Sequence, residues 1–110
     1  MRTLLVVGIV LALACGQARA DRDLCAKNTR FRGATIDLDL KAADLHDVFR
    51  LISDVGRVNI VVPDDVTGKV TLRLKRVPWD QVACTVAAVH RLAITVQGNV
   101  LLVMVQRAAG

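Results

Sequence analysis

The apolar and polar positions along the chain predict strands and helices in turn. Residues 35–41 alternate strictly between apolar and polar side chains, which predicts a half-buried strand. Residues 45–55 carry apolar side chains at helical spacing, with Asp44 as the predicted N-cap and Gly56 as the left-handed residue that ends the helix. The β-branched run at 58–62 then predicts a short buried strand.

The same order of elements returns in the second half of the chain. Residues 70–75 alternate between apolar and mostly basic side chains and predict a third strand, after which Pro78 is suited to open a second helix. Gly98-Asn99 separates two strand-like runs and predicts a two-residue hairpin. The predicted order is strand, helix, strand, strand, helix, strand, strand. It contains two short β-α-β units, without a strong sequence repeat, at 35–62 and 69–97.

The last predicted strand has apolar residues on both of its faces. In residues 100–105, Val, Leu and Met alternate with Leu, Val and Val. A small domain has few places in which both sides of a strand can be covered. Two arrangements remain open: a central strand covered on both faces, or a strand with one face exposed to a partner.

The first twenty residues have the pattern of a secretory signal peptide. Met1-Arg2 is a short basic start, residues 4–14 are almost entirely apolar, and Ala18-Arg19-Ala20 offers an Ala-x-Ala cleavage site. The apolar run is too short to span a bilayer, which needs about 20 residues. Lipoprotein processing at Cys15 is the alternative. No transmembrane segment is predicted after the signal, so we expect a soluble exported protein.

Composition changes this picture only slightly. Cleavage after residue 20 leaves 110 − 20 = 90 residues, with 15 − 2 = 13 basic against 10 acidic side chains, a net charge of +3. This is mild basicity rather than a nucleic-acid footprint. Residues 21–33 form a polar N-terminal arm in which three cations surround Phe31; a solvated leader and a nucleic-acid contact are the two interpretations. The cations are Lys27, Arg30 and Arg32.

Two cysteines remain after cleavage, Cys25 and Cys84. An even number of cysteines in an exported chain indicates one disulfide. The alternative is two unrelated thiols, one on the arm and one on the second helix.

Catalysis is not expected from this sequence. The chain has no Tyr and no Glu, and His46 and His90 have no obvious relay partner. It has no glycine-rich phosphate loop and no Cys-x-x-Cys or His-x-x-x-His pair. We therefore predict no catalytic residues, no metal site and no cofactor.

Four segments follow one another along the chain: 43–52 (ADLHDVFRLI), 58–64 (VNIVVPD), 68–72 (GKVTL) and 77–81 (VPWDQ). In this order they resemble the short secretin and TonB N-terminal domain, and most closely the copy in type IV pilus secretins. The resemblance implies an α+β domain over 34–107, in which two helices lie between two small mixed sheets.

The resemblance also implies a docking role in the periplasm, with association with the outer membrane left open. Its partner would be a protein of the cell envelope: a secretin, a pilus component or an inner-membrane component. No catalytic residue is carried over, and Phe49, Gly68 and Trp79 are assigned structural roles, Trp79 as an anchor of the second helix on a sheet with ligand stacking as the alternative. The chain ends at Gly110 without a pore segment, so channel activity is not expected.

Charged side chains mark the predicted docking edge. The strand at 35–41 exposes Asp37 and Asp39, and the strand at 70–75 exposes Thr71, Arg73 and Lys75. Open edges of small sheets can add a partner strand, with flanking charges giving selectivity. We expect these five residues to contact the partner. A periplasmic ligand- or DNA-binding protein that uses the basic residues is the alternative function.

Overall fold

The computed structural model describes residues 22–27 and 29–106. The predicted signal peptide, the Cys15 lipoprotein site and the predicted domain end at residue 107 lie outside the described residues. Within them, neither helix has the length and apolar character needed to cross a membrane.

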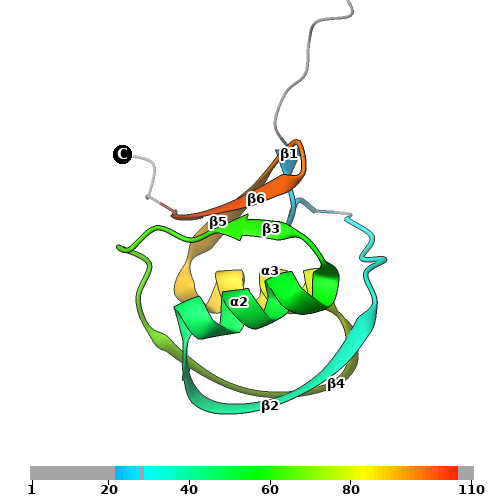
Figure 1. Cartoon of the computed structure of the whole chain (residues 1–110), viewed down its shortest axis with the longest axis vertical. Helices are drawn as coiled ribbons and strands as arrows, with labels where there is room; N and C mark the ends of the chain where they lie inside the picture. Colours follow the sequence, from blue (N-terminus) through cyan, green and yellow to red (C-terminus); the bar gives the residue numbers. More distant parts are fainter. Residues whose placement is uncertain (1–21, 28, 107–110) are drawn as a thin grey trace, which may run out of the picture.

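Two helices lie side by side between a four-stranded sheet and a two-stranded sheet (Figure 1). The chain alternates between the two sheets, and each helix carries it from the two-stranded sheet to the four-stranded one. The elements are β1 (Arg22–Asp23), β2 (Thr35–Asp44), α2 (Leu45–Gly56), β3 (Asn59–Val61), β4 (Lys69–Pro78), α3 (Trp79–His90), β5 (Leu92–Gln97) and β6 (Val100–Val105).

The larger sheet has the strand order β1-β5-β6-β3 and is mixed, because β3 runs parallel to β6 while the other two pairings are antiparallel. The smaller sheet is the antiparallel pair β2–β4. The predicted α+β architecture is confirmed. The two predicted β-α-β units are split between the sheets, so neither has its two strands side by side.

The core lies between the helices and the two sheets. Leu45, Phe49 and Ile52 of α2 are at most 1% exposed and belong to the same core cluster as Val82 and Val86 of α3. These positions follow the helical spacing in the sequence, because only one face of each helix can turn inward. Burial of this apolar face, at about 25 cal/mol per Å², is the main source of stability in such a small domain.

Helix α2 begins as predicted but ends one residue later. The Asp44 carboxylate accepts the His46 backbone N–H at 2.9 Å, so the predicted N-cap is confirmed. The prediction for Gly56 is wrong: Gly56 is helical, and Arg57 adopts the left-handed conformation with φ 52°. The glycine serves packing instead, because a Cβ at Gly56 would lie 2.7 Å from the Trp79 ring.

The start of the predicted polar arm is part of the domain. β1 pairs with the edge of β5, and Leu24 is only 7% exposed, with its N–H bonded to the Ile94 carbonyl at 2.9 Å. Residues 22–25 are therefore not a solvated leader. One leucine after three charged residues shows no periodicity, so the sequence pattern could not reveal this contact.

The chain contains an internal repeat with a constant offset of 69 − 35 = 34 residues. β2 and β4 each have 10 residues and α2 and α3 each have 12, and each helix ends at a left-handed arginine, Arg57 or Arg91. Between 35–62 and 69–96, eight of the 28 aligned pairs are identical. The prediction that the two units share no strong sequence repeat is therefore wrong.

The repeat is arranged as an internal two-fold. In the β2–β4 register, the pair Leu38↔Leu74 maps onto Leu40↔Leu72, and Asp39↔Arg73 maps onto itself. The axis thus passes between Asp39 and Arg73. In the larger sheet β6 lies between β3 and β5, which run antiparallel to each other, as a two-fold through that sheet requires.

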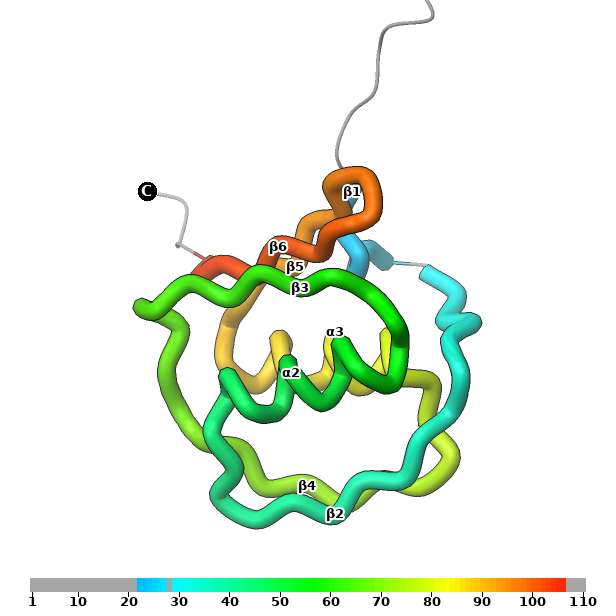
Figure 2. The backbone as a smooth tube through the Cα atoms, viewed as in Figure 1, coloured from blue at the N-terminus to red at the C-terminus, as the bar shows by residue number. Residues whose placement is uncertain are grey.

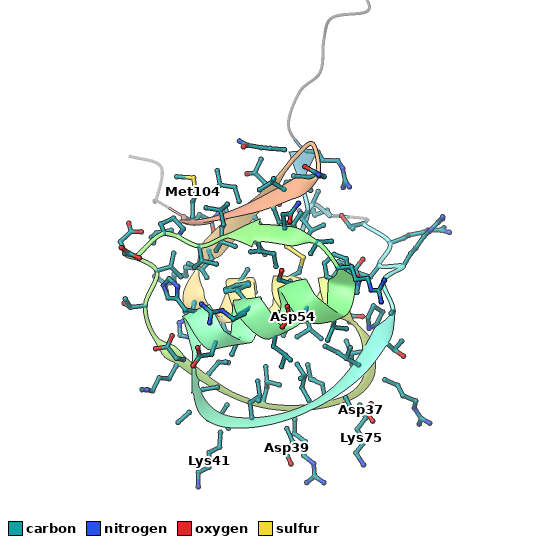
Figure 3. The ribbon with its side chains drawn as sticks, in the orientation of Figure 1. Asp37, Asp39, Lys41, Asp54, Lys75 and Met104 are labelled. Carbon is teal, nitrogen blue, oxygen red and sulfur yellow. A yellow bond between two sulfur atoms is a disulfide. The ribbon has the colours of Figure 1, made fainter. Side chains whose placement is uncertain are left out.

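Strand β6 is central in its sheet but covered on one face. Leu101 and Val103 are buried against the helices, whereas Met104 is 49% exposed on the opposite face. Figure 3 shows Met104 pointing away from the helices. The covered-strand alternative does not hold for this face among the described residues.

Candidate docking surface

The outer face of the β2–β4 sheet carries charges of opposite sign on its two strands. Asp39 of β2 lies directly opposite Arg73 of β4, and both are exposed. In Figure 3, Asp37, Asp39 and Lys75 project from this sheet away from the helices. Side chains of opposite charge on facing strands attract, but exposed pairs contribute only about 0–1 kcal/mol. These charges are therefore better suited to recognition than to stability.

Two of the five predicted partner-binding residues hold the sheet together. Residues Ala42 and Arg76 bulge with positive φ, near 51° and 54°. The Ala42 N–H donates to the Thr71 hydroxyl at 2.9 Å, and the Arg76 N–H donates to the Asp37 carboxylate at 2.7 Å. These bonds are related by the 34-residue offset. Thr71 and Asp37 thus satisfy amides that the bulges remove from the ladder.

The three remaining predicted residues, Asp39, Arg73 and Lys75, stay exposed together. A shallow hollow of about 290 Å³ is lined by them with Asp37, Leu38 and Leu74. Because the sheet has only two strands, β2 and β4 each have one edge that bonds to no other described strand. Figure 2 shows that this sheet lies at the end of the domain away from β5 and β6, reached by segments on opposite sides of the helices.

Cys25 and Cys84 are joined by a disulfide. Their Cα atoms are 5.5 Å apart, within the usual range for a bridge. The bond ties the segment after β1 to the middle of α3, where Cys84 is half-buried. It also fixes β1 on the edge of β5.

Within residues 22–27 and 29–106, no three His, Cys, Asp or Glu side chains gather where they could hold a metal ion. His46 and His90 each use Nε2 in a bond to a backbone carbonyl, of Val66 and Lys69 respectively. Both histidines therefore tie a helix to the segment that leads into or begins β4. A Cβ at Gly68, whose φ is 139°, would lie 2.8 Å from the His90 ring, so this glycine fits its predicted structural role.

The chain is similar in sequence and fold to proteins of type IV pili. No protein-family model matches the chain. The type IV pilus biogenesis and competence protein PilQ of Neisseria gonorrhoeae is 37% identical over 79 residues, which are 72% of this chain and 11% of that protein. The type IV competence pilus secretin PilQ of V. cholerae aligns with a TM-score of 0.56 and 39% identity, over 61% of this chain and 16% of that one.

The chain belongs to the secretin family and is homologous to secretin N-terminal domains. The N0 domain of the type II secretin from enterotoxigenic Escherichia coli shares this fold, with a TM-score of 0.57 and 21% identity, over 64% of this chain and 93% of that one. The chain spans only 11% of the curated PilQ relative. What the whole relatives do is therefore not carried over directly to this secretin-type domain.

Trp79, the only tryptophan, has a structural role in this secretin-type domain that differs in detail from the predicted one. It begins α3 and packs over Gly56 at the end of α2 and over Gly33 in the segment before β2, rather than against a sheet alone. Any side chain at either glycine would overlap the indole. The tryptophan thus fastens the ends of the two helices together.

Replacing Gly56 by valine is expected to displace the Trp79 ring. Overpacking of this kind costs about 1–3 kcal/mol in the free energy of unfolding. The single tryptophan reports it directly, because its fluorescence emission should shift to the red as the ring becomes exposed. Gly98→Ala is the matched control, since a Cβ there meets nothing within 4 Å and only its positive φ of 61° is strained. An unshifted emission in Gly56→Val would contradict the packing role.

Proposed function

We propose that this secretin-type domain is an exported docking module of the cell envelope. It acts in the periplasm and binds a protein component of a secretin, pilus or inner-membrane assembly. The homology to type IV pilus secretins supports a secretin-associated role. The observation that carries the docking role is the β2–β4 sheet, with Asp39 on one strand, Arg73 and Lys75 on the other, and two edges open within the described domain.

The partner contacts β4, either with a strand along its open edge or with a charged face. Backbone bonds along the open edge provide affinity, and Arg73 and Lys75 select a partner of negative charge. The nearby carboxylates of Asp37 and Asp39 disfavour a nucleic acid, because the phosphate backbone needs a surface of one sign. A protein surface of alternating charge fits both strands.

The charge reversal Arg73→Glu with Lys75→Glu is expected to slow association with the partner by about tenfold at low salt and to change its salt dependence. The partner is first identified by photo-crosslinking in the source cells, with the crosslinking side chain placed at position 73. Binding rates of the purified pair are then measured across a salt series. The folding of each variant is checked by thermal unfolding.

The control carries Lys27→Glu and Arg30→Glu, which changes the net charge equally on another exposed surface. This control should bind at nearly the unmodified rate. If the Arg73/Lys75 variant is folded and associates at the unmodified rate throughout the salt series, the β2–β4 sheet is not the docking surface. If the unmodified chain binds DNA, and this binding weakens steeply as salt rises, the nucleic-acid alternative is favoured instead.

A further inference from the structure

The internal two-fold relates two grooves, and one of them is filled by the chain itself. In the filled groove, the two-residue strand β1 and the turn that follows it lie between α3 and the outer edge of β5. Arg22 pairs with Val96 and Asp23 with Thr95, in antiparallel register, and the Leu24 N–H donates to the Ile94 carbonyl. Leu24 is buried, and the next residue, Cys25, is bonded to Cys84 of α3.

The second groove lies between α2 and the outer edge of β3. It has a volume of about 320 Å³ and is lined by His46, Phe49, Arg50, Ser53, Ile60 and Val62. Adding 34 to each number gives Asp80, Ala83, Cys84, Ala87, Ile94 and Val96, the corresponding residues around the filled groove. β3 is the end strand of its sheet, so its outer edge bonds to no other described strand.

The residues around the filled groove are more deeply buried than their counterparts around the second groove. Ile94 and Ala87, beside the bound segment, are 1% and 2% exposed. Their counterparts Ile60 and Ser53 are only half-buried, and Val61 at the same edge is 49% exposed. The second groove is therefore the counterpart of the first: Phe49, Ile60 and Val62 are its apolar residues, and no described strand covers it.

We propose that the α2–β3 groove binds an extended segment of a partner protein, paired antiparallel to β3, in which an apolar residue is followed by an acidic one. This site goes beyond the docking sheet proposed above and lies on other elements. Its failure would leave that proposal intact.

The register of the bound strand follows from the filled groove. Leu24 lies opposite Ile94, so the apolar residue of the partner lies opposite Ile60, above Phe49. Hydrogen-bonded pairs alternate along an antiparallel ladder. The amides that face the groove are therefore those of Ile60 and Val62, and they are the ones that a bound strand protects.

Arg50 defines the chemistry of the next position. Arg50 occupies the position that corresponds to Cys84 in the filled groove. There, Cys84 is bonded to Cys25, the residue after the buried leucine. Arg50 is exposed and, among the described residues, is the only arginine or lysine that lines the groove. A carboxylate at this position of the partner can accept charge-assisted bonds from the guanidinium.

The first test uses the chain's own segment as the probe. A peptide with the sequence of residues 21–26, Asp-Arg-Asp-Leu-Cys-Ala, is activated at its cysteine as a mixed disulfide with an aromatic thiol. The probe is added to the Arg50→Cys variant. The introduced thiolate attacks the peptide sulfur, a new disulfide forms, and the aromatic thiolate leaves with the electron pair and is measured by its colour. The native disulfide stays oxidised throughout.

We expect Arg50→Cys to capture this peptide at least tenfold faster than Asp54→Cys. Asp54, labelled in Figure 3, is the matched control. It is exposed one helical turn away on the same helix and is not among the residues that line the groove. A peptide with leucine replaced by aspartate should lose this preference. Equal capture rates in the two variants would overturn the proposal.

The second test measures recognition without a tether. In a titration of the unmodified chain followed by amide NMR, the peptide Asp-Arg-Asp-Leu-Glu-Ala should protect Ile60 and Val62 more than the same peptide with lysine in place of glutamate. Arg50→Glu should reverse this order, while Asp54→Lys should leave it unchanged. Protection confined to β5 would mean that the peptide displaces β1, and concentration-dependent dimers would mean that a second copy is the occupant. Either result overturns the proposal.

Discussion

Replacing both Cys25 and Cys84 by serine is expected to lower the free energy of unfolding by about 4 kcal/mol. The two cysteines are 59 residues apart, and a bridge that closes a loop of this length removes that much chain entropy from the unfolded state. For a domain of this size, each kcal/mol corresponds to about 4–8 °C in Tm. Chemical denaturation monitored by circular dichroism measures the loss.

Reduction gives an internal control for this prediction. The unmodified chain treated with a dithiol should lose the same stability, and the double variant should not respond to the dithiol. Amide exchange adds a local readout, because the Leu24 N–H is bonded to β5 only while residues 22–25 stay in place. If the double variant unfolds at the same denaturant concentration as the oxidised chain, the bridge does not stabilise the domain.

Replacing Phe49 by alanine is expected to cost about 3–5 kcal/mol, since it removes an aromatic side chain that is 1% exposed and leaves a cavity behind. The loss is large because Phe49 is among the largest fully buried side chains of the described core. Thermal unfolding and denaturant midpoints measure the effect.

Val89→Ala is the matched control for Phe49→Ala, because Val89 lies on α3 with 66% of its surface exposed. This change should cost less than about 0.5 kcal/mol. Similar losses in the two variants would show that the interior does not depend on Phe49 packing between the helices.

Most of the secondary structure could be predicted from local sequence because its causes are local. The alternation at 35–41, the helical spacing after Asp44 and the Gly98-Asn99 hairpin each depend on neighbouring residues, and each predicted element is present. Gly56 is the exception. A glycine at a helix end favours a left-handed C-cap, but the indole of Trp79, 23 residues later, needs the space above it, and Arg57 takes the left-handed position.

The candidate docking residues show the same division. Their alternation placed Asp37, Asp39, Arg73 and Lys75 on the outer face, as observed. Which of them are used inside the fold depends on two bulges, at Ala42 and Arg76, whose amides bind Thr71 and Asp37. No local pattern predicts a bulge with positive φ at alanine or arginine, because each bulge is stabilised by a side chain of the neighbouring strand.

The sequence by itself determined the helices, the strands from residue 35 onward and the resemblance to secretin N-terminal domains, because periodicity, caps, turns and ordered motifs are properties of neighbouring residues. For the two cysteines it indicated a disulfide and left two separate thiols as the alternative. The tertiary structure decided what depends on residues far apart. It placed Leu24 against the edge of β5 and Trp79 against two glycines. It also related the two halves by a two-fold, with the N-terminal segment in the α3–β5 groove and no described segment in the α2–β3 groove. These contacts arise when apolar faces of separate segments are buried together, and that burial is a property of the packed chain.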